Sequence, residues 1–330
     1  MMIREAERIK LRLQGGLIPA VPVPRYATGQ IHEQAQAAYA AYLSAQRIAG
    51  VAVWVHTGRG LHLQREEREH ILQSWKAALQ PNQIIVAGVG ARPDESLTGR
   101  KRIDSWRKTS VKMAQDAIAG GADALLVFPP VILRELPAHE QDEAVAEYHR
   151  GLAELGAPLV LFYLYEEAGG WSYSLDLLRE LLSLPNVIGI KVATLDSVMT
   201  MQNIARLLAD EYPGQLHITG EDRMFGYALM RGASSALVGL GAAFPNIQAD
   251  MIAAYRDKNY ARFIDLSARI DGYAEATFIE PMDKYILRML HCLVIANVIP
   301  REAAYDIAGY QMLEQETAAI RRAVMEHRLY

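Results

Sequence analysis

The chain is organised around the stretch LPNVIGIKVATLD, residues 184–196. Its continuous apolar run predicts a short strand buried on both faces, and Lys191 stands within that run. A lysine is seldom fully buried unless it is paired or used, because desolvating an ammonium group is costly. Burial lowers the pKa of a lysine, and the neutral amine is a nucleophile. The stretch therefore predicts a reactive amine on a buried strand.

Seven similar runs occur elsewhere in the chain, most of them continuously apolar, as in parallel strands covered on both faces. With residues 186–194, the runs are 17–23, 51–56, 83–90, 122–129, 157–165, 215–220 and 235–243. Helical periodicity fills the segments between them, at 31–49, 66–79, 110–119, 140–155, 174–182, 197–210 and 222–231. Eight such alternations predict a (β/α)8 TIM barrel over residues 1–245. An open doubly wound sheet is the rival, but no GxGxxG motif opens a helix after an early strand.

Residues 246–330 follow the eighth run and are expected to be a C-terminal helical extension. Helical periodicity recurs at 246–255, 260–276, 281–295 and 301–327. No low-complexity linker separates these residues from the barrel. We expect the extension to pack on the barrel or on a neighbouring subunit.

The composition limits the classes of function. The 330 residues carry a net charge of -4, so there is no basic excess with which to bind nucleic acid. Cys292 is the single cysteine, which excludes a disulfide framework or a cysteine metal cluster. Residues 1–16 lack the apolar core of a signal peptide, and no apolar run reaches the roughly 18 residues of a membrane span. We expect a cytoplasmic protein without membrane or nucleic-acid partners.

One predicted connection is unusually long. Residues 91–109, ARPDESLTGRKRIDSWRKT, separate the third run from its helix, whereas typical connections have about 2–6 residues. The segment is basic and would emerge on the C-terminal face of a barrel, where active sites lie. It is interpreted as a lid or a cationic rim for an anionic substrate, or alternatively as a solvated surface excursion or a subunit contact.

Strand parity suggests which side chains accompany the lysine. If Lys191 points into the barrel, then Val187 and Gly189 do so too, while Ile188 faces the helices. Tyr163 ends the preceding strand, so its phenol is expected to point at the same substrate as the amine. An amine that forms an imine and a phenol that moves a proton suit Schiff-base chemistry on a 2-oxo acid.

The second strand ends in a turn that suggests an anion site. Thr57 closes this strand, and the turn from Gly58 onward offers backbone N–H groups to an anion. Farther along the chain, Glu221 and Asp222 follow the seventh strand and are interpreted as caps of the next helix.

The segments APLVLFY and LPNVIGIKVAT resemble the YNVP strand and the GIKEA or GIKDS lysine strand of the dihydrodipicolinate synthase / N-acetylneuraminate lyase family. Tyr163 and Lys191 are 28 residues apart, as in that family, and the resemblance covers about 280 residues. It implies that Lys191 is the Schiff-base lysine and Tyr163 the proton-relay phenol. It also implies that Thr57 lies where the substrate carboxylate binds, and that the protein is a homo-oligomer, a tetramer or a dimer.

The chain also departs from this pattern. The family's GTTGE turn is Val55-His56-Thr57-Gly58-Arg59 here, and NVP is Leu164-Tyr165-Glu166. The arginine that binds a second carboxylate in the synthase falls at Ala168, and the second relay tyrosine falls at Val131. These changes argue against dihydrodipicolinate synthase itself. His56 and Arg59 are candidates for binding a different substrate, with Arg59 as the carboxylate partner, although parity turns His56 outward.

Two other function classes were weighed. A metal-dependent barrel hydrolase would need clustered histidines at strand ends, but the nine histidines are dispersed. A non-catalytic or ligand-sensing barrel remains the alternative, because fold does not fix function. The sequence favours a Schiff-base lyase, either an aldolase or a dehydratase, acting on pyruvate or another 2-oxo acid or sugar acid. No metal or organic cofactor is expected, because the lysine supplies the electron sink.

Overall fold

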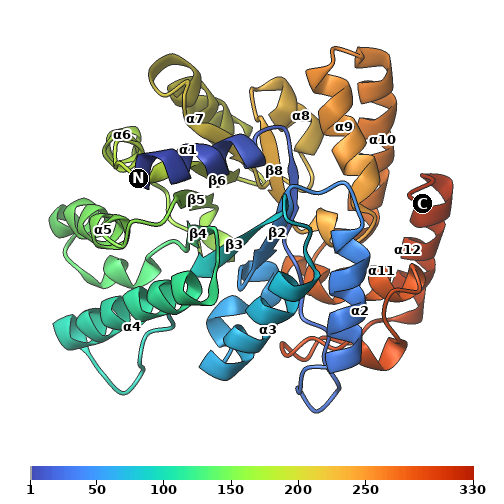
Figure 1. Cartoon of the computed structure of the whole chain (residues 1–330), viewed down its shortest axis with the longest axis horizontal. Helices are drawn as coiled ribbons and strands as arrows, with labels where there is room; N and C mark the ends of the chain where they lie inside the picture. The colour runs from blue at the N-terminus through green and yellow to red at the C-terminus, as the bar shows by residue number, and fades with distance from the viewer. Residues whose placement is uncertain (1) are drawn as a thin grey trace.

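Eight parallel strands form one sheet at the centre of the protein, whose residues 2–330 are described by a computed structural model (Figure 1). Their order is β1-β8-β7-β6-β5-β4-β3-β2, and a bridge between Ala20 and Ala52 joins the two edge strands into a barrel. The strands are β1 Leu17–Pro19, β2 Gly50–Val53, β3 Ile84–Val89, β4 Ala124–Val127, β5 Leu159–Leu164, β6 Val187–Ala193, β7 Leu216–Thr219 and β8 Ser235–Val238. The predicted TIM barrel is confirmed, and each strand overlaps one of the eight apolar runs.

The helices between the strands form the outer ring (Figure 1). They are α2 Glu33–Ser44, α3 Arg65–Ala78, α4 Gly99–Gly120, α5 Ala138–Ala153, α6 Leu175–Leu182, α7 Val198–Glu211 and α8 Phe225–Met230. An additional helix, α1 (Met2–Leu13), precedes β1 and was not expected from the sequence. Its residues Ile9 and Leu13 pack with side chains of the barrel interior, so α1 closes the end at which the strands begin.

The strand side chains divide between two hydrophobic layers. Those that point into the barrel include Ile18 and Phe162. Those that pack against the surrounding helices include Val51 and Val127. Both layers are almost fully buried, which explains why the strands are apolar throughout rather than alternating.

Strand β6 contains an irregularity that changes which side chains face inward. The pairing of β5 with β6 skips one residue just before Gly189, as in a β-bulge. Ile188 therefore belongs to the inner layer and Val187 to the outer one, opposite to the predicted parity. Beyond the bulge, Ile190 faces the helices and Lys191 faces inward, as predicted. Position 189 requires a glycine, because a Cβ there would lie 2.3 Å from the carbonyl oxygen of Leu216 on β7.

The long basic connection is mostly helical, so its interpretation as a lid over residues 91–109 is wrong. Helix α4 begins at Gly99 and buries Ile103 and Trp106 against the barrel. Its cationic side chains form ion pairs with residues on or just before α5, including Arg107 with Glu147 at 3.0 Å. The apolar spacing of this helix is masked in the sequence by the arginines and lysines around it.

The C-terminal extension packs against the barrel and supplies part of one end of it (Figure 1). Its helices are α9 Pro245–Arg256, α10 Tyr260–Thr277, α11 Tyr285–Ile295 and α12 Glu314–Glu326. The helix predicted over 301–327 is wrong in its first half, where a short 3-10 turn leads into non-helical chain. There Ala304 forms a bridge to Arg25, and Asp306 binds Arg59. The boundary between residues 1–245 and 246–330 stays a prediction. Among the helices described, none has the length and apolarity needed to cross a bilayer.

Candidate active site

A cavity of about 650 Å³ opens at the C-terminal ends of the strands, which is where barrel enzymes carry their catalytic groups. The ends of β2, β5, β6, β7 and β8 contribute to its wall, and so does the chain between α10 and α11. Lys191, Thr57 and His56 line it, whereas Tyr163, Gly58 and Arg59 do not. The structure therefore brings together half of the side chains expected at the site.

Lys191 enters the cavity from β6 and is 8% exposed. Its Nζ lies 4.2 Å from the centre of the Phe162 ring, an apolar neighbour with a favourable cation–π face. The side chain passes over Gly220, where a Cβ would lie 2.5 Å from the lysine Cε. Burial lowers the pKa of Lys191 to about 8, while the negative charges of Asp222 and Glu221 oppose that shift. A substantial share of the amine is therefore neutral near pH 8.

Asp222 shares the cavity with the lysine and lies in the connection from β7 to α8. It accepts a hydrogen bond of 2.7 Å from the Leu240 amide. Burial raises the pKa of Asp222 to about 7, although that hydrogen bond and the nearby lysine favour its ionised form. The interpretation of Asp222 as a helix cap is wrong, because α8 begins only at Phe225. A carboxyl group that titrates near neutral pH therefore lies in the same cavity as the amine.

Glu221 has a structural position beside Asp222 and is completely buried. Its carboxylate accepts hydrogen bonds from the amide and hydroxyl of Thr194 and from the amide of Leu195. Leu195 has a left-handed backbone with φ of 51°, which is uncommon for a residue with a side chain. Glu221 thus fixes the chain that leaves β6 just after the lysine, and it is not a helix cap either.

Tyr163 does not lie beside Lys191, and the placement predicted for it is wrong. In the sheet, Phe162 is paired with Lys191, whereas Tyr163 is paired with Val192. Tyr163 belongs to the layer that packs against the helices, and its hydroxyl lies 3.5 Å from Ser172 Oγ. A shift of one residue in register moves a side chain to the opposite face of a strand. The aromatic neighbour of the lysine is therefore a phenylalanine without a hydroxyl group.

The turn after β2 does not present the expected row of free amides. It is a 3-10 turn in which the Gly58 amide donates to Val55 and the Arg59 amide donates to the His56 carbonyl. Gly58 lies against the Val21 carbonyl, away from the cavity, so the backbone anion site predicted there is wrong. From this turn, the Thr57 hydroxyl and the imidazole of His56 reach the cavity.

Arg59 is used within the protein, so it is not available as the expected carboxylate partner. Its guanidinium binds both oxygens of Asp306, at 2.9 and 2.6 Å, and it donates to Asp283 at 2.8 Å. These bonds raise the pKa of Arg59 although burial opposes them. Both aspartates belong to the C-terminal extension, which means that Arg59 ties this extension to the barrel.

Tyr285 is a further residue of the site, and no pattern in the sequence pointed to it. It is the first residue of α11, and its hydroxyl lies 2.8 Å from Thr57 Oγ1 and 3.2 Å from His56 Nδ1. His56 Nε2 lies 3.8 Å from Asp283 Oδ1 on the other side of the ring. The outward parity predicted for His56 is therefore wrong, because the residue lies in the turn after the strand has ended. A tyrosine near the start of a predicted helix is ordinarily a packing residue, so the local sequence does not indicate that Tyr285 belongs to the site.

The remaining charged lining of the cavity is mostly acidic. Glu167, Asp196, Glu280 and Asp283 contribute to its wall, together with one cation, Arg223. The pKa of Tyr165 is raised first by burial and then by these four negative charges, which shows that they gather around one phenol. Such a lining repels a substrate end that carries a second negative charge.

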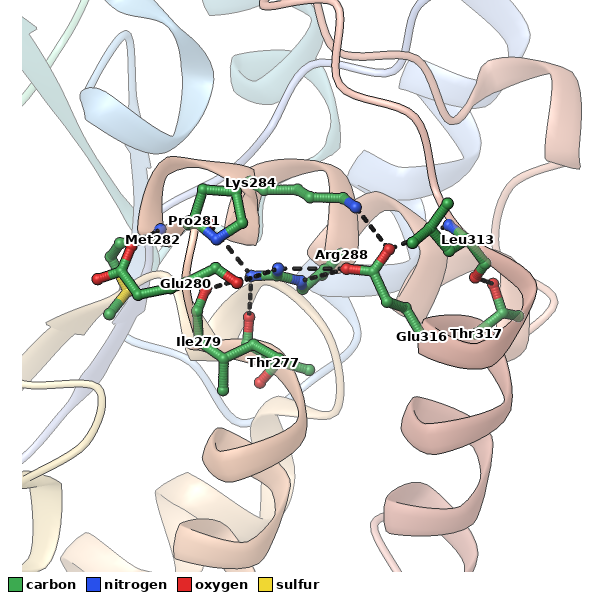
Figure 2. Close-up of polar contacts among 10 residues, drawn as sticks. All are labelled: Thr277, Ile279, Glu280, Pro281, Met282, Lys284, Arg288, Leu313, Glu316 and Thr317. Atoms are coloured by element: carbon green, nitrogen blue, oxygen red, sulfur yellow. Dashed lines mark hydrogen bonds and ion pairs between the residues drawn. The ribbon is translucent and has the colours of Figure 1, made fainter.

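Figure 2 shows how the chain between α10 and α11 is held. Arg288 is 1% exposed and donates to the main-chain carbonyls of Thr277, Ile279 and Glu280 at 3.3, 2.6 and 3.3 Å. Glu316 of α12 binds Arg288 at 3.2 Å and also accepts from Lys284. Because this chain leads into Tyr285, the cluster of the buried Arg288 and Lys284 with the partly buried Glu316 supports one wall of the cavity.

Comparison with known proteins identifies the family to which the chain is similar. The model of the dihydrodipicolinate synthetase family matches residues 13–304. The probable mitochondrial 4-hydroxy-2-oxoglutarate aldolase of Emericella nidulans is 28% identical over 249 residues, which are 73% of this chain and 74% of that protein. The N-acetylneuraminate lyase of Rhizobium meliloti is 25% identical over 94% of each chain.

Solved structures share the fold at lower identity. The sialic acid aldolase of Ruminococcus gnavus has a TM-score of 0.79 and 18% identity, covering 96% of this chain and 97% of that one. The prophage protein YagE of E. coli K12, of the dihydrodipicolinic acid synthase family and in complex with pyruvate, has a TM-score of 0.81 and 18% identity over 96% and 99%. These similarities establish the barrel together with its C-terminal helices.

Proposed function

Because this chain belongs to the dihydrodipicolinate synthetase family, a family of aldolases and lyases, we propose that it is a Schiff-base lyase acting through Lys191. The substrate we propose is pyruvate, another 2-oxo acid or a sugar acid. The observation that carries the proposal is a buried amine, with its pKa lowered to about 8, in the main cavity at the C-terminal face of the barrel. Groups with such shifted pKa values concentrate at functional sites.

The chemistry begins with the neutral amine of Lys191. Its lone pair attacks the C2 carbonyl of the 2-oxo acid, and the hydroxyl of the resulting carbinolamine takes up a proton from solvent. Loss of that hydroxyl as water leaves an iminium ion on the lysine nitrogen. The iminium accepts the electron pair of a bond that breaks at the neighbouring carbon. An aldolase breaks a carbon–carbon bond in this way, and a dehydratase first removes a proton there and then expels hydroxide. Both reactions start from the same iminium ion on Lys191, which accepts the electron pair of the bond that breaks.

The acidic lining points to the kind of substrate. Four carboxylates around Tyr165 disfavour an aldehyde fragment with its own carboxylate, and they accept hydrogen bonds readily from hydroxyl groups. We therefore favour a substrate with one carboxylate and a hydroxylated chain. The assembly is also a proposal. A tetramer or dimer is expected, and sedimentation equilibrium of the purified chain measures it.

Imine trapping tests the proposed function. The protein is incubated with pyruvate and borohydride, and its intact mass is measured. We expect one reduced adduct on the wild type and none on Lys191→Ala. Lys112→Ala removes a lysine on the surface of α4, which pairs with Asp116, and should trap as the wild type does. Absence of an adduct with pyruvate and with a panel of 2-oxo acids and sugar acids would favour a non-catalytic barrel instead.

The pH dependence of trapping adds a second readout. Only the neutral amine attacks the carbonyl, so the rate should rise with pH until the amine is fully deprotonated. For Lys191 the rate should be half-maximal near pH 8 and flat above about pH 9, whereas with an ordinary lysine of pKa 10.5 it would keep rising. A rate that still climbs tenfold per unit above pH 9 would show that the reacting amine is not the buried one.

A further inference from the structure

The cavity lacks the phenol expected beside Lys191, and two other tyrosines, Tyr165 and Tyr285, line it. Of these two, Tyr285 has a hydroxyl that contacts other groups of the cavity wall, Thr57 and His56. Phe162 is the side chain next to Lys191 on β5, and it has no proton to give. The hydroxyl of Tyr285 enters the same cavity from α11 and lies 2.8 Å from Thr57 Oγ1. Gly239 makes room for this ring, since a Cβ at Gly239 would lie 2.8 Å from Tyr285 Cε2. The backbone at the end of β8 is thus shaped to admit Tyr285.

Behind the phenol stands a basic group with a defined orientation. Tyr285 is 3.2 Å from His56 Nδ1, and Asp283 Oδ1 is 3.8 Å from the opposite ring nitrogen. Arg59 donates to the same Asp283 oxygen at 2.8 Å and so fixes that carboxylate. A carboxylate near Nε2 favours the tautomer with its proton there. The lone pair of Nδ1 then points at the Tyr285 hydroxyl.

The titration of these groups fits a relay that starts from neutral partners. Burial lowers the pKa of His56, and the charges of Arg59 and Lys191 lower it further, while Asp283 opposes them. Burial also raises the pKa of Tyr285 well above that of an exposed phenol. Before reaction the imidazole is therefore unprotonated and the phenol is intact. The effect of the lysine charge on His56 also shows that the histidine lies within electrostatic reach of the amine.

We propose that Tyr285 is the catalytic residue that moves the proton at the carbon next to the imine, with His56 as the acceptor behind it. The inference rests on the proposed function, because this proton becomes acidic only when an imine forms on Lys191. It assigns a role in the reaction to the C-terminal extension, whose first residue of α11 provides the phenol.

The step balances within these groups. The C–H bond next to the iminium carbon breaks, its electron pair forms the enamine double bond, and the iminium π pair moves to nitrogen. The Tyr285 oxygen accepts the proton while its own O–H proton passes to His56 Nδ1. The iminium loses one positive charge and the imidazole gains one, so no further reactant is needed. The reverse transfer protonates the enamine that an aldol cleavage leaves behind.

Hydrogen–deuterium exchange at the methyl group of pyruvate in D2O measures this step directly, and trapping measures imine formation separately. We expect Tyr285→Phe to trap pyruvate within about twofold of the wild type and to exchange its methyl protons about a hundredfold more slowly or worse. Tyr212→Phe removes a phenol that bonds to the Arg179 carbonyl between α6 and α7, away from the cavity. This control should trap and exchange as the wild type does.

The outcomes separate the inference from the proposed function. A wild type that forms no adduct overturns the proposed function. An adduct together with wild-type exchange in Tyr285→Phe overturns the inference alone. If Tyr285→Phe no longer traps, His56→Leu decides, because it keeps the phenol and removes only the acceptor. Exchange slowed at least tenfold in His56→Leu, with trapping retained, supports the relay, and unchanged exchange overturns it.

Discussion

Lys191 and Tyr285 reach the same cavity from two regions that are held in place by different forces. Lys191 belongs to a central strand that is hydrogen-bonded to β5 on one side and to β7 on the other, between two apolar layers. Tyr285 follows a non-helical segment whose carbonyls are bound by one arginine side chain, Arg288. The strand that carries the amine is thus positioned by many distributed contacts, whereas the segment that leads to the phenol depends on a few polar ones. A single substitution should therefore disturb the second region without the first.

The largest effect is expected for Arg288→Ala. The change leaves four carbonyls without their donor and removes one of the two cations that neutralise Glu316 (Figure 2). Breaking a buried ion pair on one side typically costs about 3–5 kcal/mol. We expect the free energy of unfolding to fall by that amount in urea titrations. Because α11 starts beside this cluster, methyl exchange of pyruvate should suffer more than imine trapping.

Arg179→Ala is the matched control for this prediction. Arg179 pairs with Glu211 at 2.7 Å and with Asp176 at 2.7 Å, but its side chain is 39% exposed. Exposed ion pairs contribute about 0–1 kcal/mol, because water solvates both partners when the pair is broken. If Arg288→Ala costs as little as this control, the segment before α11 is held by other contacts and the contrast between the two regions disappears.

A smaller effect, confined to the barrel side, is expected for Gly220→Ala. The added Cβ would lie 2.5 Å from Lys191 Cε and 3.1 Å from the Ala193 Cβ, so the flexible lysine has to move. A displacement of about 1 Å can cost up to a hundredfold in rate, while overpacking costs about 1–3 kcal/mol in stability. We expect the rate of imine trapping to fall tenfold to a hundredfold. Gly214→Ala, with no atom within 4 Å of its Cβ, should change neither rate nor stability.

A trapping rate unchanged in Gly220→Ala would mean that the amine does not need the position seen in the structure. If Gly220→Ala instead loses methyl exchange and keeps imine trapping, the substitution acts on Tyr285 rather than on Lys191. The two variants, Arg288→Ala and Gly220→Ala, therefore report on opposite walls of one cavity.

The barrel and its lysine can be predicted from the sequence because their signals are local. Each strand is a short apolar run, and a charged residue inside such a run stands out from its neighbours. Helix α4 was predicted to begin 11 residues too late, since the arginines and lysines from Arg100 to Lys108 hide its apolar positions. The chain before α12 was predicted as helix, but it is non-helical after the 3-10 turn at Arg301–Ala303, and Asp306 there binds Arg59.

The partners of the lysine depend on information that no short stretch contains. The bulge before Gly189 shifts β6 against β5 by one residue, and that shift exchanges Phe162 for Tyr163 at the lysine. Tyr285 comes close to Thr57 only because α11 docks at the barrel end, and that docking depends on Arg59, Asp283 and Arg288 together. For this reason the family resemblance led to one residue that lies in the cavity, Lys191, and to one that does not, Tyr163.

The smallest effect is expected for Tyr163→Phe, and it separates the two phenols most sharply. The hydroxyl of Tyr163 makes one long contact of 3.5 Å, to Ser172, and its ring lies among residues of the outer layer near Tyr173. Removing it should cost no more than about 1 kcal/mol in unfolding free energy, because a weak hydrogen bond contributes little net stability. Trapping and methyl exchange should both stay within about twofold of the wild type, in contrast to Tyr285→Phe.

A hundredfold loss of exchange in Tyr163→Phe, with Tyr285→Phe unaffected, would show that β5 pairs with β6 in the other register during reaction. The phenol would then come from the barrel rather than from its C-terminal extension.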